Sequence, residues 1–159
     1  MTAATARTSH ESPDHVLLRR LGHAGLIPFV VLALMLWLLD GEQQAFVAIA
    51  LAGYGALILS FLGGVHWGLA WSLDRSVVQP TPNLRRQLLL WGVTPSLLAW
   101  PGVLMPPFAG LAWLGFMLIL NYLADRTLYP RAGLQHWLTL RFRLSAVAAL
   151  SCFIGAGAL

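Results

Sequence analysis

Residues 45–73 read AFVAIALAGYGALILSFLGGVHWGLAWSL, and no Asp, Glu, Lys or Arg interrupts them. A helix needs about 20 predominantly apolar residues to cross the ~30 Å hydrocarbon core of a bilayer. This stretch exceeds that minimum, so we expect a membrane-spanning helix that tilts or emerges into the interface beyond about Val65. Other apolar segments flank it on both sides. We therefore predict an all-α fold, a polytopic membrane helix bundle.

The overall composition excludes several soluble classes of protein. The chain has 159 residues, of which 58% are hydrophobic and 10% charged, and its mean hydropathy is +0.71. Because a soluble domain carries about 25% charged residues, this chain has too few polar groups to cover a globular surface. A typical soluble enzyme, a disordered chain and a nucleic-acid-binding module are excluded. One cysteine, Cys152, cannot form an internal disulfide framework or a cysteine-rich metal site.

The apolar segments predict five transmembrane helices. The expected spans are about residues 24–39, 45–68, 88–104, 108–124 and 142–159, within a transmembrane domain of residues 24–159. All must be helical, because isolated strands would leave unpaired backbone groups in lipid. Residues 1–23 are polar, and we expect them to form a flexible cytoplasmic tail. The first residue of the fifth helix is left open.

The arginines test this count, because successive loops lie on opposite sides of the membrane. All ten fall on one side: Arg7, Arg19 and Arg20 in the tail, Arg75, Arg85 and Arg86 in the 74–87 loop, and Arg126, Arg131, Arg141 and Arg143 in the 125–143 loop. Arginine-rich loops stay cytoplasmic, which predicts the N-terminus inside and the C-terminus outside. The basic charge then reflects topology and anionic lipid headgroups, and we expect no nucleic-acid partner.

Small residues recur at every fourth position of the second span. They are Ala48, Ala52, Ala56, Ser60, Gly64 and Gly68. Helices in lipid associate through close backbone contact over small residues, so we expect this series to form one helix-packing seam. The seam could contact another helix of the chain or a second copy in a homo-oligomer. A bulky residue at Gly64 is expected to disrupt it.

Polar side chains at membrane depth are costly and point to function. A rise of about 1.5 Å per residue places several of them toward the cytoplasmic side. The candidate ligand-binding residues are Tyr54, Ser60, His66, Trp67, Asn121, Asp125 and Arg141. His66 could be a hydrogen-bonded structural residue, part of a quinone, lipid or proton site, or a metal or haem ligand.

Simple structural roles are available for the other candidates. Asp125 is most simply a membrane-boundary ion pair, beside Arg126 and within reach of Arg141 if the last two helices adjoin. Asn121 is expected to bridge helices by a hydrogen bond, and Trp67 is a candidate pocket wall because it follows His66.

The sequence contains no nucleotide-binding loop, HExxH motif or nucleophile–base pair, so we predict no catalytic residues and no metal site. It specifies no cofactor.

Residues 53–68, GYGALILSFLGGVHWG, resemble the signature of a family of small polytopic membrane proteins of unknown function, the transmembrane protein sixty-nine family. The similarity extends through Thr94 and Pro95, residues 121–125 and residues 137–144, and it covers about residues 24–159. The animal members are mitochondrial and most relatives are proteobacterial. The resemblance implies five spans and an inner-membrane location, and it carries no reaction, ligand or partner.

Two functions fit these observations. The first is an integral inner-membrane protein without catalytic machinery, a binding or assembly factor for lipid or other membrane proteins. The distribution of the resembled family implies a link to respiratory complexes. The alternative is a site for quinone, haem or a small solute, for binding or transport, near the cytoplasmic face around His66. Replacing His66 by Gln should be nearly silent in a scaffold and should abolish binding or transport at a site.

Overall fold

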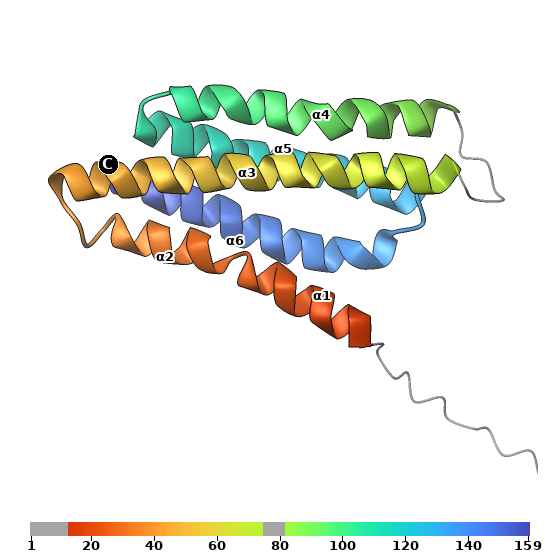
Figure 1. Cartoon of the computed structure of the whole chain (residues 1–159), viewed down its shortest axis with the longest axis horizontal. Helices are drawn as coiled ribbons and strands as arrows, with labels where there is room; N and C mark the ends of the chain where they lie inside the picture. The colour runs from red at the N-terminus through yellow and green to blue at the C-terminus, as the bar shows by residue number, and fades with distance from the viewer. Residues whose placement is uncertain (1–12, 75–81) are drawn as a thin grey trace, which may run out of the picture.

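A computed structural model describes residues 13–74 and 82–159, and these residues contain helices and no strand (Figure 1). The elements are α1 (Pro13–Ala24), α2 (Ile27–Met35), α3 (Gly41–Asp74), α4 (Pro82–Leu104), α5 (Pro107–Arg131), the 3₁₀ turn η1 (Gln135–Trp137) and α6 (Leu138–Ala156). Five helical stretches are long and apolar enough to cross a membrane, and α1 with α2 supplies the first of them. The predicted all-helical, five-span class is confirmed.

The first span is broken into two helices. The break lies at Gly25 and Leu26, whose N–H groups donate to the carbonyl oxygens of Leu21 and His23. The Tyr54 hydroxyl on α3 donates to the Gly25 carbonyl at 2.8 Å, which satisfies a backbone group that the break leaves free. Figure 1 shows α1 diverging from the bundle beyond this point. Residues 13–23 are helical, because they belong to α1, whereas we predicted them to be part of a flexible tail. Residues 1–12 of that tail lie outside the described residues.

The remaining helices pack side by side along most of their length (Figure 1). The most extensive contacts are between α3 and α4 and between α5 and α6, while α2 lies against α3 and α6. Fully buried apolar side chains fill the interior, including Phe29, Leu51 and Leu114. This packing places the inward faces of α3, α5 and α6 around a common interior.

Several helices continue beyond the predicted apolar spans at the end that carries the arginines. There α4 begins at Pro82, before Arg85 and Arg86, and α5 continues to Arg131. Long arginine side chains can bury their stems and keep the guanidinium in water, so a helix need not stop where the hydrocarbon ends.

The turn between α5 and η1 contains Gly133, whose φ of 77° is a left-handed conformation that favours glycine.

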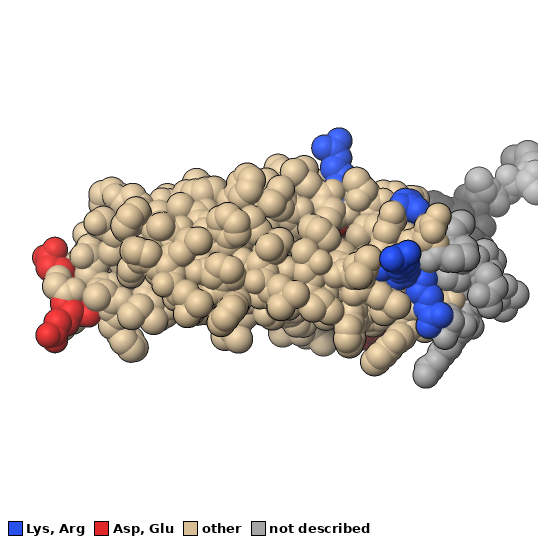
Figure 2. All heavy atoms as spheres, turned by 90° about the horizontal axis from the view of Figure 1, so that it is seen from above, with Lys and Arg blue, Asp and Glu red and all other residues tan. Residues whose placement is uncertain are grey.

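The described arginines lie toward one end of the bundle, whereas acidic residues occur at both ends, with Asp14 and Asp125 at the same end as the arginines. Figure 2 shows the blue basic side chains toward one end and red acidic side chains at the other. The acidic end holds the exposed residues Asp40 and Glu42, at the connection between α2 and α3. We refer to the opposite end as the arginine end.

Within one chain, only the first half of the small-residue series on α3 packs against neighbouring helices. Ala48 and Ala52 are buried, but Ser60, Gly64 and Gly68 face outward, and a Cβ atom added at either glycine would meet no atom within 4 Å. An i, i+4 step advances about 400°, so the series drifts by about 40° at each step and leaves the packed face. Packing of a second copy against the exposed half stays a prediction.

Other glycines allow the close helix contacts. A Cβ at Gly63 would overlap the carbonyl oxygen of Gly92, where α3 crosses α4. A Cβ at Gly110 would overlap the carbonyl oxygen of Gly102, between α4 and α5. These two contacts have the close backbone approach that small residues permit in membrane helices.

Candidate functional site

A buried cluster of ionisable side chains joins three helices at the arginine end. At its centre is Asp125 on α5, which is 0% exposed. One carboxylate oxygen, Oδ1, lies 2.9 Å from Nε2 of His66 on α3. The other, Oδ2, accepts a 2.7 Å hydrogen bond from Nε of Arg141 on α6 and a second bond from Nη2 of the same guanidinium. The predicted ion pair between Asp125 and Arg141 is confirmed, and His66 joins it.

Each ring nitrogen of His66 lies close to an oxygen atom. Its Nδ1 is 2.9 Å from the carbonyl oxygen of Leu62, one helical turn earlier, and a carbonyl can only accept. Nδ1 therefore carries a hydrogen. The Nε2–Oδ1 contact is short but not aligned as a hydrogen bond.

Tyr129 is a member of this cluster that the sequence analysis missed. It is buried on α5, one turn after Asp125, and its ring centre lies 5.8 Å from that of His66. It also lies beside both Asp125 and Arg141. The i, i+4 spacing from Asp125 was a usable signal, because residues at that spacing share a helix face.

Asn121 lies one turn before Asp125 and connects α5 to α4. Its side-chain oxygen accepts a 3.2 Å hydrogen bond from Nε1 of Trp91, so the predicted helix-bridging role is confirmed. Its Nδ2 is buried and has no hydrogen-bond partner among the described residues. Asn121 therefore lies next to the cluster of His66, Asp125 and Arg141, but its hydrogen-bond partner, Trp91, is on α4 rather than on α3 or α6.

Tyr54, Ser60 and Trp67 do not join the predicted polar layer. Ser60 is exposed, and Tyr54 holds the α1–α2 break about 18 Å from His66 along α3. Trp67 is 41% exposed and donates to the carbonyl oxygen of Leu89 at 2.9 Å on α4. Successive helical residues are rotated by about 100°, so Trp67 turns toward α4 when its neighbour His66 faces α5.

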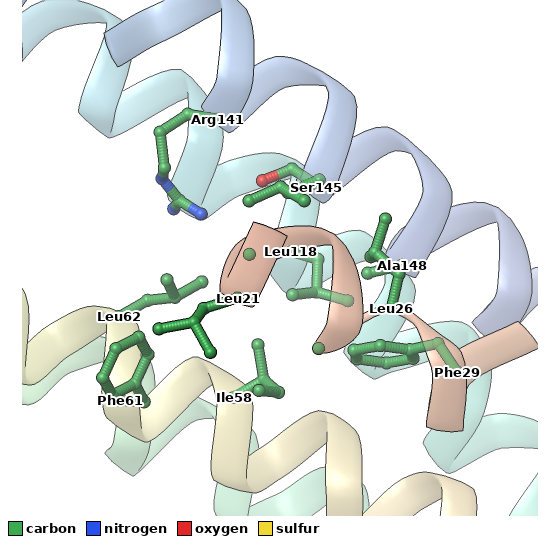
Figure 3. Close-up of a pocket in the computed structure, with 13 residues that line it drawn as sticks. Leu21, Leu26, Phe29, Ile58, Phe61, Leu62, Leu118, Arg141, Ser145 and Ala148 are labelled. Atoms are coloured by element: carbon green, nitrogen blue, oxygen red, sulfur yellow. The ribbon is translucent and has the colours of Figure 1, made fainter. Parts of the chain in front are cut away.

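An apolar pocket of about 310 Å³ opens beside the charged cluster (Figure 3). We call it the apolar pocket. Figure 3 shows Arg141 and Ser145 on α6 across from Ile58, Phe61 and Leu62 on α3. The rest of its lining consists of small and apolar residues from α1, α2, α5 and α6 and from the α1–α2 break: Leu21, Gly22, Gly25, Leu26, Phe29, Leu118, Leu144 and Ala148.

Its polar side chains lie together on α6. Arg141 is 8% exposed and contacts Asp125 as well as the pocket, and Ser145 lies one turn later. The Ser145 Oγ is buried without a hydrogen-bond partner among the described residues. Two donors of Arg141 bind Asp125, and a guanidinium carries five, so the pocket can supply donors to a ligand oxygen.

The geometry weighs against metal or haem ligation by His66 in this conformation. Both ring nitrogens already contact oxygen atoms, those of Leu62 and Asp125. A metal would have to displace one of these contacts, since a ligating nitrogen needs a free lone pair. Across the described ranges, no three His, Cys, Asp or Glu side chains form a group that could hold a metal ion.

Comparison with known proteins gives a family for this chain. A family described as "Protein of unknown function (DUF3429)" matches residues 15–157. The chain belongs to the DUF3429 family. It is 38% identical over 136 residues to Transmembrane protein 69 of Xenopus tropicalis, a match that covers 82% of this chain and 50% of that protein.

The chain thus spans about half the length of the curated relative that it matches. No solved structure matches it. The resemblance drawn from the 53–68 stretch is confirmed, and with the five apolar helices it makes this DUF3429 chain a multi-pass membrane protein.

Proposed function

We propose that this DUF3429 protein binds a membrane lipid in the apolar pocket. The observation that supports this most strongly is the combination of an apolar wall with polar groups confined to α6. The volume of about 310 Å³ falls within the range of small-molecule sites, roughly 300–1,000 Å³. An acyl chain fits the wall of Leu, Ile and Phe side chains, and its ester or acid oxygen reaches Arg141 and Ser145.

Selectivity in such a site comes from its polar end. Lipid tails are as apolar as leucine, so transferring an acyl chain from bulk lipid into an apolar pocket gains little hydrophobic free energy. An oxygen bound by Arg141 and Ser145 gains donors that the hydrocarbon core cannot supply. A quinone carbonyl meets the same requirement, which keeps quinone as the second candidate.

We also propose that the arginine end faces the cytoplasm of a bacterial cell, with the chain in the inner membrane. Exposed arginines gather at this end, and the exposed acids Asp40 and Glu42 lie at the other. Positively charged loops are retained on the cytoplasmic side, which supports an N-terminus inside and a C-terminus outside. Association with other membrane proteins, including a role in respiratory assembly, stays a prediction.

Native mass spectrometry of the purified protein tests the lipid site. Leu21→Trp places a larger ring at the apolar pocket, whereas Leu17→Trp changes an equally exposed position one turn earlier that does not line it. We expect bound lipid to be lost from the Leu21 variant and kept by the Leu17 variant. Ser145→Ala should weaken retention without removing the cavity.

The mass of the retained molecule separates the two candidates. A phospholipid or fatty acid supports the lipid proposal, and a quinone supports the alternative. Equal retention by the Leu21 and Leu17 variants, or a protein that carries neither molecule in lipid-replete preparations, would contradict the assignment of the site.

A further inference from the structure

A second pocket, of about 290 Å³, lies between α1 and the beginning of α6. We call it the basic pocket. It lies on the other side of the α1–α6 contact from the apolar pocket, because Gly22 and Leu144 meet between the two. Its chemistry-bearing side chains are His15, Arg19, His23, His136, Trp137 and Arg143.

One face of α1 supplies three of these residues. His15, Arg19 and His23 follow one another at i, i+4 and i+8, a spacing that puts them along the same side of a helix. The Nδ1 of His23 lies 2.7 Å from the carbonyl oxygen of Arg19, so this nitrogen is held within the helix and Nε2 is left to face outward. The polar stripe of α1 faces η1 and α6, because its three residues line one pocket with residues of those elements.

The opposite wall comes from η1 and the first turns of α6. Trp137 is half-buried there, and its ring centre lies 6.3 Å from that of His15 and 5.8 Å from that of His136. Tryptophan is typical of the membrane–water interface, where one side of the ring is apolar and the other is wet. The two imidazoles are therefore gathered around an interfacial anchor, with Arg143 on the next turns of α6.

The ionisable groups among the described lining residues of the basic pocket are all basic. Two arginines and three histidines line it, and no Asp or Glu is among the described residues that do. Three of the four histidines in the described ranges gather here, with His66 as the fourth. They do not form a metal-ligand group. A pocket of cationic and N–H donor groups without an acidic lining residue suits an anion.

We propose that the basic pocket binds the phosphate group of an anionic ligand. Guanidinium forks bind phosphate oxygens in pairs, and imidazole N–H groups add single donors around them. Its position at the arginine end, beside an interfacial tryptophan, suits the phosphate of a lipid headgroup, and a soluble phosphate ester presents the same oxygens. This site does not depend on the apolar pocket, since the two share no lining residue.

Titration calorimetry in detergent micelles separates the two sources of phosphate. The ligands are a short-chain phosphatidylglycerol, the matched phosphatidylcholine, glycerol phosphate and inorganic phosphate. Each arginine near an anionic headgroup contributes about fivefold in affinity, so Arg19→Gln with Arg143→Gln should weaken phosphatidylglycerol binding about 25-fold. The control pair, Arg86→Gln with Arg126→Gln, removes the same charge from exposed positions outside the basic pocket and should change affinity by less than threefold.

A third variant covers the case in which the glutamine pair fails to fold. Arg19→Lys with Arg143→Lys keeps the charge but loses the paired donors, and we expect an intermediate loss of affinity of less than tenfold. Replacing the three histidines by Gln should likewise weaken binding. Leu21→Trp at the apolar pocket should leave phosphate binding unchanged, so the two sites can fail separately.

Each outcome decides the proposal. Preference for phosphatidylglycerol that depends on the basic pocket identifies a lipid phosphate. Tighter binding of glycerol phosphate or inorganic phosphate, with the same dependence on the basic pocket, identifies a soluble ester. Equal weakening by the pocket and control pairs would show general attraction to a charged surface and overturn the site, as would binding that neither pair changes.

Discussion

Replacing Asp125 by Asn removes the carboxylate that holds His66 and Arg141 together. Two guanidinium donors of Arg141 end on this carboxylate, and Arg141 is 8% exposed. Breaking a buried ion pair by removing one partner costs about 3–5 kcal/mol, because the other charge is left uncompensated. Arg141 lies in the first turn of α6, where its side chain can reach toward water, so we expect the lower end, about 3 kcal/mol.

Reversible unfolding in mixed micelles, followed by circular dichroism, measures this cost as a change in the free energy of unfolding. Arg126→Gln is the matched control, since Arg126 is the next residue on α5 and is exposed. It should change the free energy by no more than about 0.5 kcal/mol. Combining Asp125→Asn with Arg141→Gln should cost less than the sum of the two single changes, by about 1–3 kcal/mol, because neither charge is then left alone.

A destabilisation by Asp125→Asn within about 0.5 kcal/mol of the Arg126 control would refute this reasoning. It would mean that the guanidinium finds water or another partner at no cost. Additive single changes would refute it in a second way, since they would show that Asp125 and Arg141 do not interact energetically.

Two further predictions concern helix packing. Gly63→Ala should destabilise the bundle by about 1–3 kcal/mol, because its Cβ would overlap the carbonyl oxygen of Gly92, whereas Gly64→Ala should be nearly neutral in the same unfolding assay. Equal effects of the two would contradict the observed crossing of α3 and α4. Trp91→Phe removes the hydrogen bond to Asn121 and should cost about 0.6–1.7 kcal/mol, which a double-mutant cycle with Asn121→Leu would attribute to the pair.

The number of spans could be predicted because each span is a long apolar segment, and because a count of five places all ten arginines on the same side of the membrane. The helix ends could not be, because hydropathy locates the hydrocarbon rather than the hydrogen-bonded backbone. Residues 13–23 show this most clearly. They carry Arg19 and Arg20 and read as a polar tail, yet they form a helix that contributes to both pockets.

The centre of the site was partly predictable. Asp125 and Arg141 both lie at the arginine-end boundary of adjoining helices, so their pairing follows from depth and adjacency. Ser60 was placed with them by depth and Trp67 by its position after His66, and helical rotation turns each to another face. Depth along a helix can be counted from sequence, but the direction of a side chain also requires knowing which neighbour each face meets.

Neither pocket could be inferred from the sequence. Both are lined by residues of α1, which is separated from α2 by the break at Gly25, where the Tyr54 hydroxyl donates to the Gly25 carbonyl oxygen. The i, i+4, i+8 stripe of His15, Arg19 and His23 was visible, but its partners on η1 and α6 were not.

The proposed topology has the arginine end facing the cytoplasm, and cysteine labelling tests this directly. In a Cys152→Ala background, Gln43→Cys reports on the acidic end and Gln135→Cys on the arginine end, both at exposed positions. A membrane-impermeant maleimide added to intact spheroplasts should label the first at once and the second only after permeabilisation. Labelling of both from one side, or of Gln135→Cys alone in intact spheroplasts, would contradict the proposed topology.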